Sequence, residues 1–440
     1  MIIKCANLGL IKKAEITIDG ITVIAGENDT GKSTVSKLMF ILSNILDIRN
    51  IDNYKVRLRK RNIQSAINNI RNSNDNSAMR VLNRAIHVSP YINNLLKELS
   101  ESCDDNRIHE ILFLIESKLK ENMNDEGAVY NESFLKKYLN NVYVASKKEF
   151  QNDELISIML KRYFKSLFDN DICSKYSDEF TSVQLVENGI SLIDLELKDN
   201  NIEKIEYLYN TGVGTVTYVE SPLILQYSSM IEKARTVLDA DDSFPAFFDI
   251  AQVDVISKDL INKLTTPFGI LDDNDTEISK DISQIIDGNV KYDETSSTFI
   301  YDKDGIVYNI KNTASGIKTF GILQVLIEKG FLGENTLLIL DEPEVNVHPK
   351  WQIKYAELIV KLAKQLNVKI LLNSHSPYFI EAIHILSKYE NFDSRVNFYE
   401  AKKCNESKFT SIEKIHNVDS IFAALSEPFD TLDEIRLSNF

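Results

Sequence analysis

The chain has 440 residues, of which 43% are hydrophobic and 26% are charged, and its formal net charge at pH 7 is −15. This length and apolar content predict a globular protein with a substantial core in two or three folding units. The acidic balance excludes broad, sequence-independent coating of nucleic acid, because such binding needs a basic surface.

The sequence carries no signal for secretion, membrane insertion or metal-binding cysteines. The first residues, MIIKCANLGL, contain no basic segment followed by an apolar segment and a cleavage site. The most apolar windows, KLMFILSNILDI and NTLLILDEP, are short and interrupted by polar residues. The four cysteines lie far apart, which predicts reduced thiols and argues against a zinc site. We therefore expect a cytoplasmic protein without membrane contact.

Three short strands are predicted near the N-terminus, at residues 2–6, 14–18 and 21–25. The Asp19-Gly20 dipeptide favours a tight hairpin turn between the second and the third strand. The third strand continues into GENDTGKST, which fits the P-loop pattern G-x-x-x-x-G-K-[ST], and a helix is predicted to open at Ser33. The motif therefore lies between a strand and a helix, where a P-loop must lie.

This segment predicts a site for a nucleoside triphosphate and Mg²⁺. Glycines let the loop curl so that backbone N–H groups and the helix N-terminus surround a phosphate. Lys32 would neutralise charge on the β- and γ-phosphates, and Ser33 is the expected Mg²⁺ ligand. The alternative is a chance glycine-rich turn, which the flanking strand and helix disfavour. The candidate nucleotide-binding residues of the loop are Gly26, Asn28, Gly31, Lys32, Ser33 and Thr34.

About 280 residues separate Lys32 from Ser315, more than a compact nucleotide-binding core needs. We expect an inserted lobe there, with helices over residues 36–99 and 106–162 and without the sustained heptads of a coiled-coil arm. Strands over residues 181–220 and a hairpin over residues 291–310 would rebuild sheet beside the core. The expected divisions are an N-terminal part of the core at residues 1–40, a mainly helical lobe at 41–180, a mixed segment at 181–290 and a C-terminal part of the core at 291–440.

A basic interval from Arg49 to Arg84 stands out in this acidic chain. Only Asp52 and Asp75 are acidic within it. Such a run is usually a solvated helix face, and the alternative is binding of nucleic acid or an acidic partner. Its basic residues are Arg49, Lys55, Arg57, Arg59, Lys60, Arg61, Arg71, Arg80 and Arg84.

The C-terminal region predicts two apolar strands that end in polar side chains. Residues 335–340 (NTLLIL) run into Asp341 and Glu342, as expected for a buried parallel strand that delivers carboxylates at its end. Asp341 would hold Mg²⁺ through water, and Glu342 would orient and deprotonate the attacking water as a catalytic base. A helix over residues 350–366 follows, with one buried face formed by Ile353, Ala356, Val360 and Ala363.

The second of these strands, residues 368–372, ends in the polar run Asn373-Ser374-His375-Ser376. A lone histidine is more often structural than catalytic. His375, however, follows the strand after the Asp341 strand, where a side chain can sense the γ-phosphate. We therefore predict a catalytic role for His375.

The stretch TASGIKTF precedes the Asp341 strand and contains neither a nucleophile nor a metal ligand. Ser315 and Gly316 open an apolar helix that Gly330 would close. A serine hydroxyl and a glycine N–H at a helix N-terminus can bind an anion without a lysine. The stretch taken alone is an ordinary helix start.

These pieces resemble the ATP-binding-cassette (ABC) ATPases, in particular the soluble branch related to structural-maintenance-of-chromosomes (SMC) and RecF-type proteins. The resemblance covers residues 1–40 and the chain from about residue 290 onward. It implies that Ser315 of one subunit touches the γ-phosphate held by Lys32 of another, so that a homodimer shares two sites. Ile317 and Lys318 depart from the Gly-Gln pair of the usual LSGGQ-like signature.

Within that branch, the segments NTASGIKTFGILQ, LLILDEPEVNVHP and NSHSPYF look like ATPases of the overcoming-lysogenization-defect group, many of which occur in antiphage defence operons. VTYVESPLILQYSS also looks like that group, and Gln226 is its candidate for a loop that couples ATP to the inserted lobe. The tail after His375 is too short for an appended nuclease domain. The resemblance therefore implies a separate effector protein as partner.

The expected fold class is α/β, an ABC-type P-loop NTPase core with a largely helical inserted lobe. The expected function is an ATP-hydrolysing dimeric switch that uses ATP and Mg²⁺, in antiphage defence. One alternative is a RecF-like DNA-repair ATPase in which the basic interval from Arg49 to Arg84 binds DNA. Another is the nucleotide-binding subunit of a membrane transporter, which fits the long insertion poorly.

Overall fold

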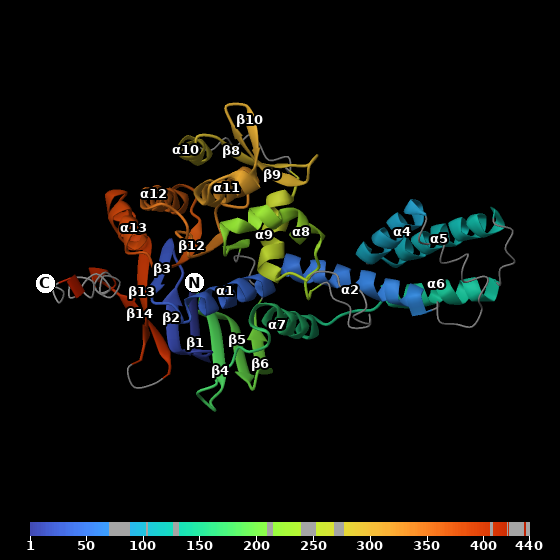
Figure 1. Cartoon of the computed structure of the whole chain (residues 1–440). Helices are drawn as coiled ribbons and strands as arrows, with labels where there is room; N and C mark the ends of the chain where they lie inside the picture. Colours follow the sequence, from blue (N-terminus) through green and yellow to red (C-terminus); the bar gives the residue numbers. More distant parts are fainter. Residues whose placement is uncertain are drawn as a thin grey trace. The chain divides into compact units, whose positions relative to one another are not determined.

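The computed structural model describes residues 1–69, 89–102, 104–125, 132–208, 214–238, 252–267, 277–404, 408–419, 421 and 435–436. The chain divides into two compact units, whose elements are labelled in Figure 1. The second unit consists of Arg49–Ile158 and Asp241–Pro245, and is therefore an insertion into the sequence of the first. The first unit consists of Met1–Ile48, Met159–Ala240 and Ala246–Phe440.

The first unit is built on one large sheet. Among the described residues it has eleven strands in the order β6-β5-β4-β1-β2-β14-β13-β3-β12-β11-β7. Blue N-terminal strands therefore lie beside orange and red C-terminal strands (Figure 1). The strands are β1 (Ile2–Leu8), β2 (Ile11–Thr17), β3 (Ile21–Gly26), β4 (Thr181–Glu187), β5 (Ile190–Lys198), β6 (Asn201–Tyr207), β7 (Val216–Val219), β11 (Leu337–Asp341), β12 (Lys369–Ser374), β13 (Val396–Lys403) and β14 (Thr410–Ile415).

The five strands from β13 to β7 are parallel and form the centre of this unit. Every residue of β3 and β11 is buried, as expected for parallel strands covered on both faces. Helix α1 (Lys32–Leu46) contacts β3, β7, β11 and β12. Alternate residues of β3, namely Ile21, Val23 and Ala25, belong instead to an apolar cluster with α11 (Ser315–Glu328), α12 (Pro349–Gln365) and α13 (Pro377–Tyr389).

The predicted hairpin between the second and third strands is wrong. Strand β2 pairs with β1 through the turn between Leu8 and Ile11, and β14 and β13 separate β2 from β3. The Asp19-Gly20 turn instead joins neighbours from the far end of the sequence: Asp19 accepts a hydrogen bond from Arg395 at 2.8 Å, and Gly20 O accepts one from the amide of residue 370 at 2.7 Å. Gly20 has φ +52°, and a Cβ atom there would lie 2.3 Å from Arg395 O, so this close crossing requires glycine.

A separate antiparallel sheet of three strands packs on α11. The predicted hairpin over residues 291–310 is confirmed in the turn between Lys303 and Ile306. These strands do not join the large sheet, because Val290 packs against Gly321 of α11 and fixes the small sheet there. The strands are β8 (Asn289–Asp293), β9 (Thr298–Lys303) and β10 (Ile306–Asn309).

The remaining helices of the first unit surround these sheets. Gly330 closes α11 as expected: its φ is +72°, and its N–H donates to Ile327 O at 2.9 Å. Helix α12 buries Ala356, Val360 and Ala363 as predicted. Ile353 is instead 49% exposed, because the helix turns Gln352 inward to donate to Val347 O at 3.0 Å. The other helices are α8 (Ser228–Lys233), α9 (Val255–Thr265) and α10 (Glu277–Ile286), with short 3₁₀ turns at Pro222–Tyr227, Ile310–Asn312 and Asp393–Arg395.

The second unit is helical in every regular element of its described residues, as the sequence predicts. Its core is its own, and includes Ile63, Leu99, Ile111 and Tyr138. Helix α7 (Asn152–Phe168) begins in this unit and continues into the first. No helix in the described part of the chain is long and apolar enough to span a membrane. The other helices are α2 (Ile48–Asn69), α4 (Pro90–Glu101), α5 (Asp105–Asp125) and α6 (Glu132–Ser146).

Candidate active site

The carboxyl ends of three neighbouring parallel strands form the candidate site. Strand β12 lies between β3 and β11, with Asn373 opposite both Ile24 and Asp341 in the register. The P-loop after β3, the acids at the end of β11 and the polar run at the end of β12 therefore share one edge of the sheet. Crevices at this edge are where open α/β sheets bind ligands.

The P-loop is held in a tight curl by glycines. Gly26 has φ +148°, and a Cβ atom at this position would lie 2.4 Å from Ala401 O on β13. Gly31 has φ +87° and stands directly before α1, whose first N–H groups point toward the loop. Asn28 is exposed at the tip, and Thr34 is half-buried in the first helical turn. The loop thus presents a helix N-terminus suited to an anion.

Lys32 points its ammonium into this curl. The side chain is buried, and Nζ donates to Gly26 O at 2.9 Å and to Glu27 O at 2.7 Å. Burial lowers the pKa of Lys32, while the charges of Glu342 and Asp341 act in the opposite direction. Its two partners are neutral carbonyls, so a phosphate offered to this loop would be the stronger acceptor.

Asp341 lies at the end of β11 and is hydrogen-bonded from three elements. Ser33 Oγ donates to its Oδ1 at 3.1 Å, and Asn373 Nδ2 donates to the same oxygen at 2.9 Å. Tyr218 of β7 donates its hydroxyl to Oδ2 at 2.8 Å. Ser33 and Asp341 were singled out in the sequence, and the fold brings them together. Two hard oxygen donors at this spacing fit Mg²⁺, which takes few protein ligands and completes its shell with phosphate and water.

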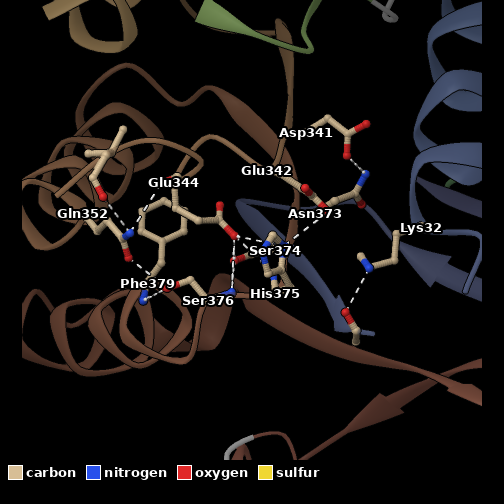
Figure 2. A network of polar contacts seen from close by, with 12 residues as sticks. Lys32, Asp341, Glu342, Glu344, Gln352, Asn373, Ser374, His375, Ser376 and Phe379 are labelled. Carbon is tan, nitrogen blue, oxygen red and sulfur yellow. Dashed lines mark hydrogen bonds and ion pairs between the residues drawn. The ribbon is translucent and has the colours of Figure 1, made fainter. Parts of the chain in front are cut away.

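Glu342 and His375 also meet at this edge, as Figure 2 shows. Glu342 Oε1 lies 3.3 Å from His375 Nδ1, and both side chains are partly exposed. Glu342 has φ +48°, and its N–H donates to Asn373 O at 3.0 Å, which anchors the turn that presents the carboxylate. A carboxylate and an imidazole side by side can orient a water and handle its proton.

Glu344 belongs to the same cluster, although sequence reasoning gave it no role. Its side chain is 3% exposed. Oε1 accepts hydrogen bonds from Ser374 Oγ at 2.6 Å, from the N–H of His375 at 3.1 Å and from the N–H of Ser376 at 3.3 Å (Figure 2). Oε2 is buried and has no hydrogen-bond partner among the described residues. Glu344 thus fixes the loop that carries His375 and keeps one unpaired oxygen, and burial raises its pKa.

Replacing Glu344 by glutamine should remove a loss of stability that the wild-type protein shows as the pH rises. In the folded state the pKa of the Glu344 carboxyl lies above its ordinary value of 4.5. The free energy of unfolding therefore decreases as the pH rises from the ordinary pKa through the folded-state pKa. Glutamine keeps an oxygen acceptor and carries no charge. The Tm difference between Glu344→Gln and wild type should therefore increase from about pH 4 to about pH 8 in thermal melts. Glu344→Ala, which removes the acceptor, should melt lower at every pH. A Glu344→Gln difference that is flat or falls with pH would contradict this assignment.

Ser315 and Gly316 lie beside the segment after β11. Ser315 Oγ donates to Asn346 O, and a Cβ atom on Gly316 would lie 2.4 Å from the indole ring of Trp351. Lys318, which stands where the usual signature has glutamine, is buried and donates to Thr313 O at 2.9 Å. No hydrogen bond among the described residues joins Ser315 or Gly316 to the P-loop. Packing against Trp351 therefore explains a glycine at position 316, in addition to the proposed role in anion binding.

Sequence reasoning missed Tyr218, Ser36 and Glu344, and gave Asn373 no role. Ser36 and Asn373 hydrogen-bond to each other, with Asn373 Nδ2 donating to Ser36 Oγ at 2.9 Å. Asn373 opens the polar run that follows a predicted strand, and this position at a strand end is the signal that could have identified it. Tyr218 lies within an apolar strand, where an aromatic residue gives no signal of its own. Gln226 is half-buried in the 3₁₀ turn after β7.

The chain is similar to one protein family and to several solved structures. Residues 1–380 match the family described as AAA ATPase domain. No curated protein matches the chain. One similar solved structure is an SMC head domain from Thermotoga maritima, with 10% identity, a TM-score of 0.38, and coverage of 94% of this chain and 98% of that one.

Two further solved structures are also SMC heads. One is bound to the C-winged helix domain of ScpA, with 11% identity, a TM-score of 0.36 and coverage of 94% and 96% of the two chains. The other has an extended coiled coil and is bound to the C-terminal domain of ScpA derived from Pyrococcus furiosus, with 10% identity, a TM-score of 0.31 and coverage of 99% and 98%.

The expected α/β P-loop NTPase core with a largely helical inserted lobe is confirmed. The family match spans most of the chain and includes the P-loop, the acids after β11 and His375. The chain belongs to the AAA ATPase domain family, and it is an ATPase.

Proposed function

We propose that the protein is an ATP-driven dimeric switch whose two chains close on two ATP molecules and reopen after hydrolysis. Lys32 and the N-terminus of α1 would hold the phosphates, and Ser33 and Asp341 would hold Mg²⁺, which neutralises charge that develops on the phosphates. Glu342 would orient and deprotonate the attacking water, and His375 would contact the γ-phosphate. The single observation that carries this assignment is the meeting of Ser33, Asp341, Glu342 and His375 at one sheet edge.

The dimer is proposed because no hydrogen bond among the described residues of one chain joins the signature serine to the P-loop. Ser315 bonds within its own chain to Asn346 O, and Ser33 bonds to Asp341. A helix N-terminus with a hydroxyl can complete a phosphate site from a second copy. We infer that Ser315 and Gly316 of one chain face the γ-phosphate held by Lys32 of the other.

Light scattering of Glu342→Gln, with and without Mg-ATP, tests the dimer. We expect the mass to double on addition of Mg-ATP. Ser315→Trp should abolish the doubling, and Ser177→Trp, a substitution before β4, should not. A chain that stays monomeric with ATP bound would reject the switch.

Complementation tests the shared site even in a constitutive oligomer. Lys32→Ala and Ser315→Trp should each be inactive alone. In a mixed dimer, one site combines the intact P-loop of one chain with the intact Ser315 of the other. Coexpression with two different tags should therefore restore ATPase activity. Two inactive variants that remain inactive in a verified mixed oligomer would show that the site does not need a second copy.

The biological setting that we propose is antiphage defence through a separate effector protein. The support is the resemblance of three motifs to the overcoming-lysogenization-defect group, together with a helical unit that has a core of its own. We expect an effector protein to copurify with Glu342→Gln in the presence of Mg-ATP. The same protein should not copurify with Lys32→Ala. Phage plating on cells that express the protein together with the copurified partner should fall relative to cells that express neither, and Lys32→Ala should restore plating. Equal plating would contradict the defence role.

The second candidate is a DNA-binding ATPase in repair, and the basic face of α2 favours it. Arg49, Arg57 and Lys60 are exposed there, while Lys55 pairs with Asp52 at 3.3 Å. Arg71, Arg80 and Arg84 lie outside the described residues. DNA-stimulated hydrolysis with a steep salt dependence would support this candidate. Binding that survives charge reversal at Arg57, Arg59 and Arg61 would reject it.

A further inference from the structure

Tyr218 is a buried side chain in contact with the candidate metal ligand. It lies in the middle of β7, fully buried, and its hydroxyl donates to Asp341 Oδ2 at 2.8 Å. Strand β7 pairs only with β11 among the described strands, with Tyr218 opposite Ile339. The tyrosine therefore reaches along the sheet to the carboxylate at the end of the neighbouring strand.

The hydrogen bonds of Asp341 divide between its two oxygens. Oδ1 accepts from Ser33 at 3.1 Å and from Asn373 at 2.9 Å, whereas Oδ2 accepts from Tyr218. The side that faces Ser33 is the side on which a shared Mg²⁺ ion would be held. A donor on the opposite oxygen fixes the rotation of the carboxylate about its own bond and keeps Oδ1 toward Ser33.

The ring of Tyr218 is fixed in this position by its neighbours. Phe40 of α1 packs edge-on against it, with ring centroids 6.1 Å apart and planes at 88°. Helix α1 carries Ser33, so one element holds both the tyrosine ring and the other proposed metal ligand.

We propose that Tyr218 is a positioning residue that orients Asp341 for Mg²⁺. The proposal rests on the proposed role of Asp341 as a metal ligand. Partners of ligating carboxylates fix their geometry, and removing such a partner typically costs about 10- to 100-fold in metal affinity. Tyr218 would act through Asp341 rather than directly on the nucleotide or the metal, so its loss should alter the metal requirement rather than the phosphate site.

The test compares metal dependence in Tyr218→Phe, which keeps the ring and removes the hydroxyl. In a Glu342→Gln background that does not turn over, a fluorescent ATP analogue is titrated with Mg²⁺. We expect the Mg²⁺ concentration for half-maximal binding to rise about 10- to 100-fold. Analogue affinity in EDTA should stay unchanged. Mn²⁺ binding followed by electron paramagnetic resonance should weaken by the same factor.

The matched control is Tyr399→Phe. Tyr399 is also a fully buried tyrosine, and its hydroxyl accepts from the N–H of Thr17 at 2.8 Å, away from Asp341. Each substitution removes one buried hydroxyl. A lower Tm in both variants would therefore reflect a general loss of stability and not an effect on Mg²⁺ binding. An unchanged Mg²⁺ midpoint in Tyr218→Phe, with the same Tm loss as the control, would overturn the proposal.

Asp341→Asn separates this inference from the proposed site. If Asp341→Asn raises the Mg²⁺ midpoint and Tyr218→Phe does not, Asp341 is a ligand and Tyr218 only a packing residue. If Asp341→Asn leaves the midpoint unchanged, the proposed ligand role fails first. The proposal requires both variants to shift the midpoint, with the larger shift in Asp341→Asn.

Discussion

Replacement of Glu342 by glutamine is expected to lower kcat for ATP hydrolysis by about 10²- to 10⁴-fold, the usual contribution of a general base. The carboxylate stands 3.3 Å from His375 at the edge of the sheet where the P-loop opens. Glutamine keeps the size and loses the basic oxygen, so ATP binding should persist. Phosphate release measures the first effect, and equilibrium binding of a fluorescent ATP analogue measures the second.

A glutamate on the outer face of α13 serves as the control for this change. Glu381 is exposed, and Glu381→Gln makes the same chemical change away from the site. Its kcat should equal that of wild type. Wild-type hydrolysis in Glu342→Gln would mean that the base is another group, and Glu344, whose Oε1 lies 3.8 Å from His375 Nδ1, would then be the next carboxylate to examine.

Replacement of Lys32 by alanine is expected to weaken ATP binding by about 10- to 100-fold, which corresponds to hydrogen bonds with charged groups worth about 1.5–3 kcal/mol. The ammonium is buried inside the loop, and its hydrogen-bond partners among the described residues are the carbonyls of Gly26 and Glu27. No other lysine or arginine stands within the loop GENDTGKST. Equilibrium binding of the same fluorescent analogue gives the affinity directly.

The matched control for Lys32 is Lys13→Ala. Lys13 is exposed on β2, and its loss removes an equal charge without touching the loop. ATP affinity should therefore be unchanged in that variant. Retention of affinity in Lys32→Ala would reject the P-loop as the phosphate site and would leave the Glu342–His375 pair without a substrate.

The site could be predicted largely because its parts are short and local. The P-loop is contiguous, its shape depends on glycines that the pattern specifies, and parallel strands deliver their end residues to one edge. Asp341, Glu342 and His375 each follow an apolar strand directly, so their meeting needed only that β12 lie between β3 and β11.

The failures concern partners that come from far along the chain. The Asp19-Gly20 pair carries a valid hairpin signal, but Arg395 and the neighbours of β3 override it. Ile353 is apolar at helical spacing, yet the hydrogen bonds of Gln352 turn it outward. Tyr218 resembles any core aromatic residue until the strand beside it is known to end in Asp341.

The pairing of β3 has a consequence for biosynthesis. All six residues of this strand are buried, and Ile21 stands opposite Ile370 and Val396. About 350 residues are therefore translated before its first parallel neighbour exists, which takes roughly 20–70 s at about 5–20 residues per second. The inserted helical unit has a core within residues 63–142 and can form while the ribosome is still working. Strand β3, which leads to the P-loop, has no parallel partner until β12 and β13 have been synthesised. We therefore expect folding of this ATPase to depend on a chaperone that protects nascent strands.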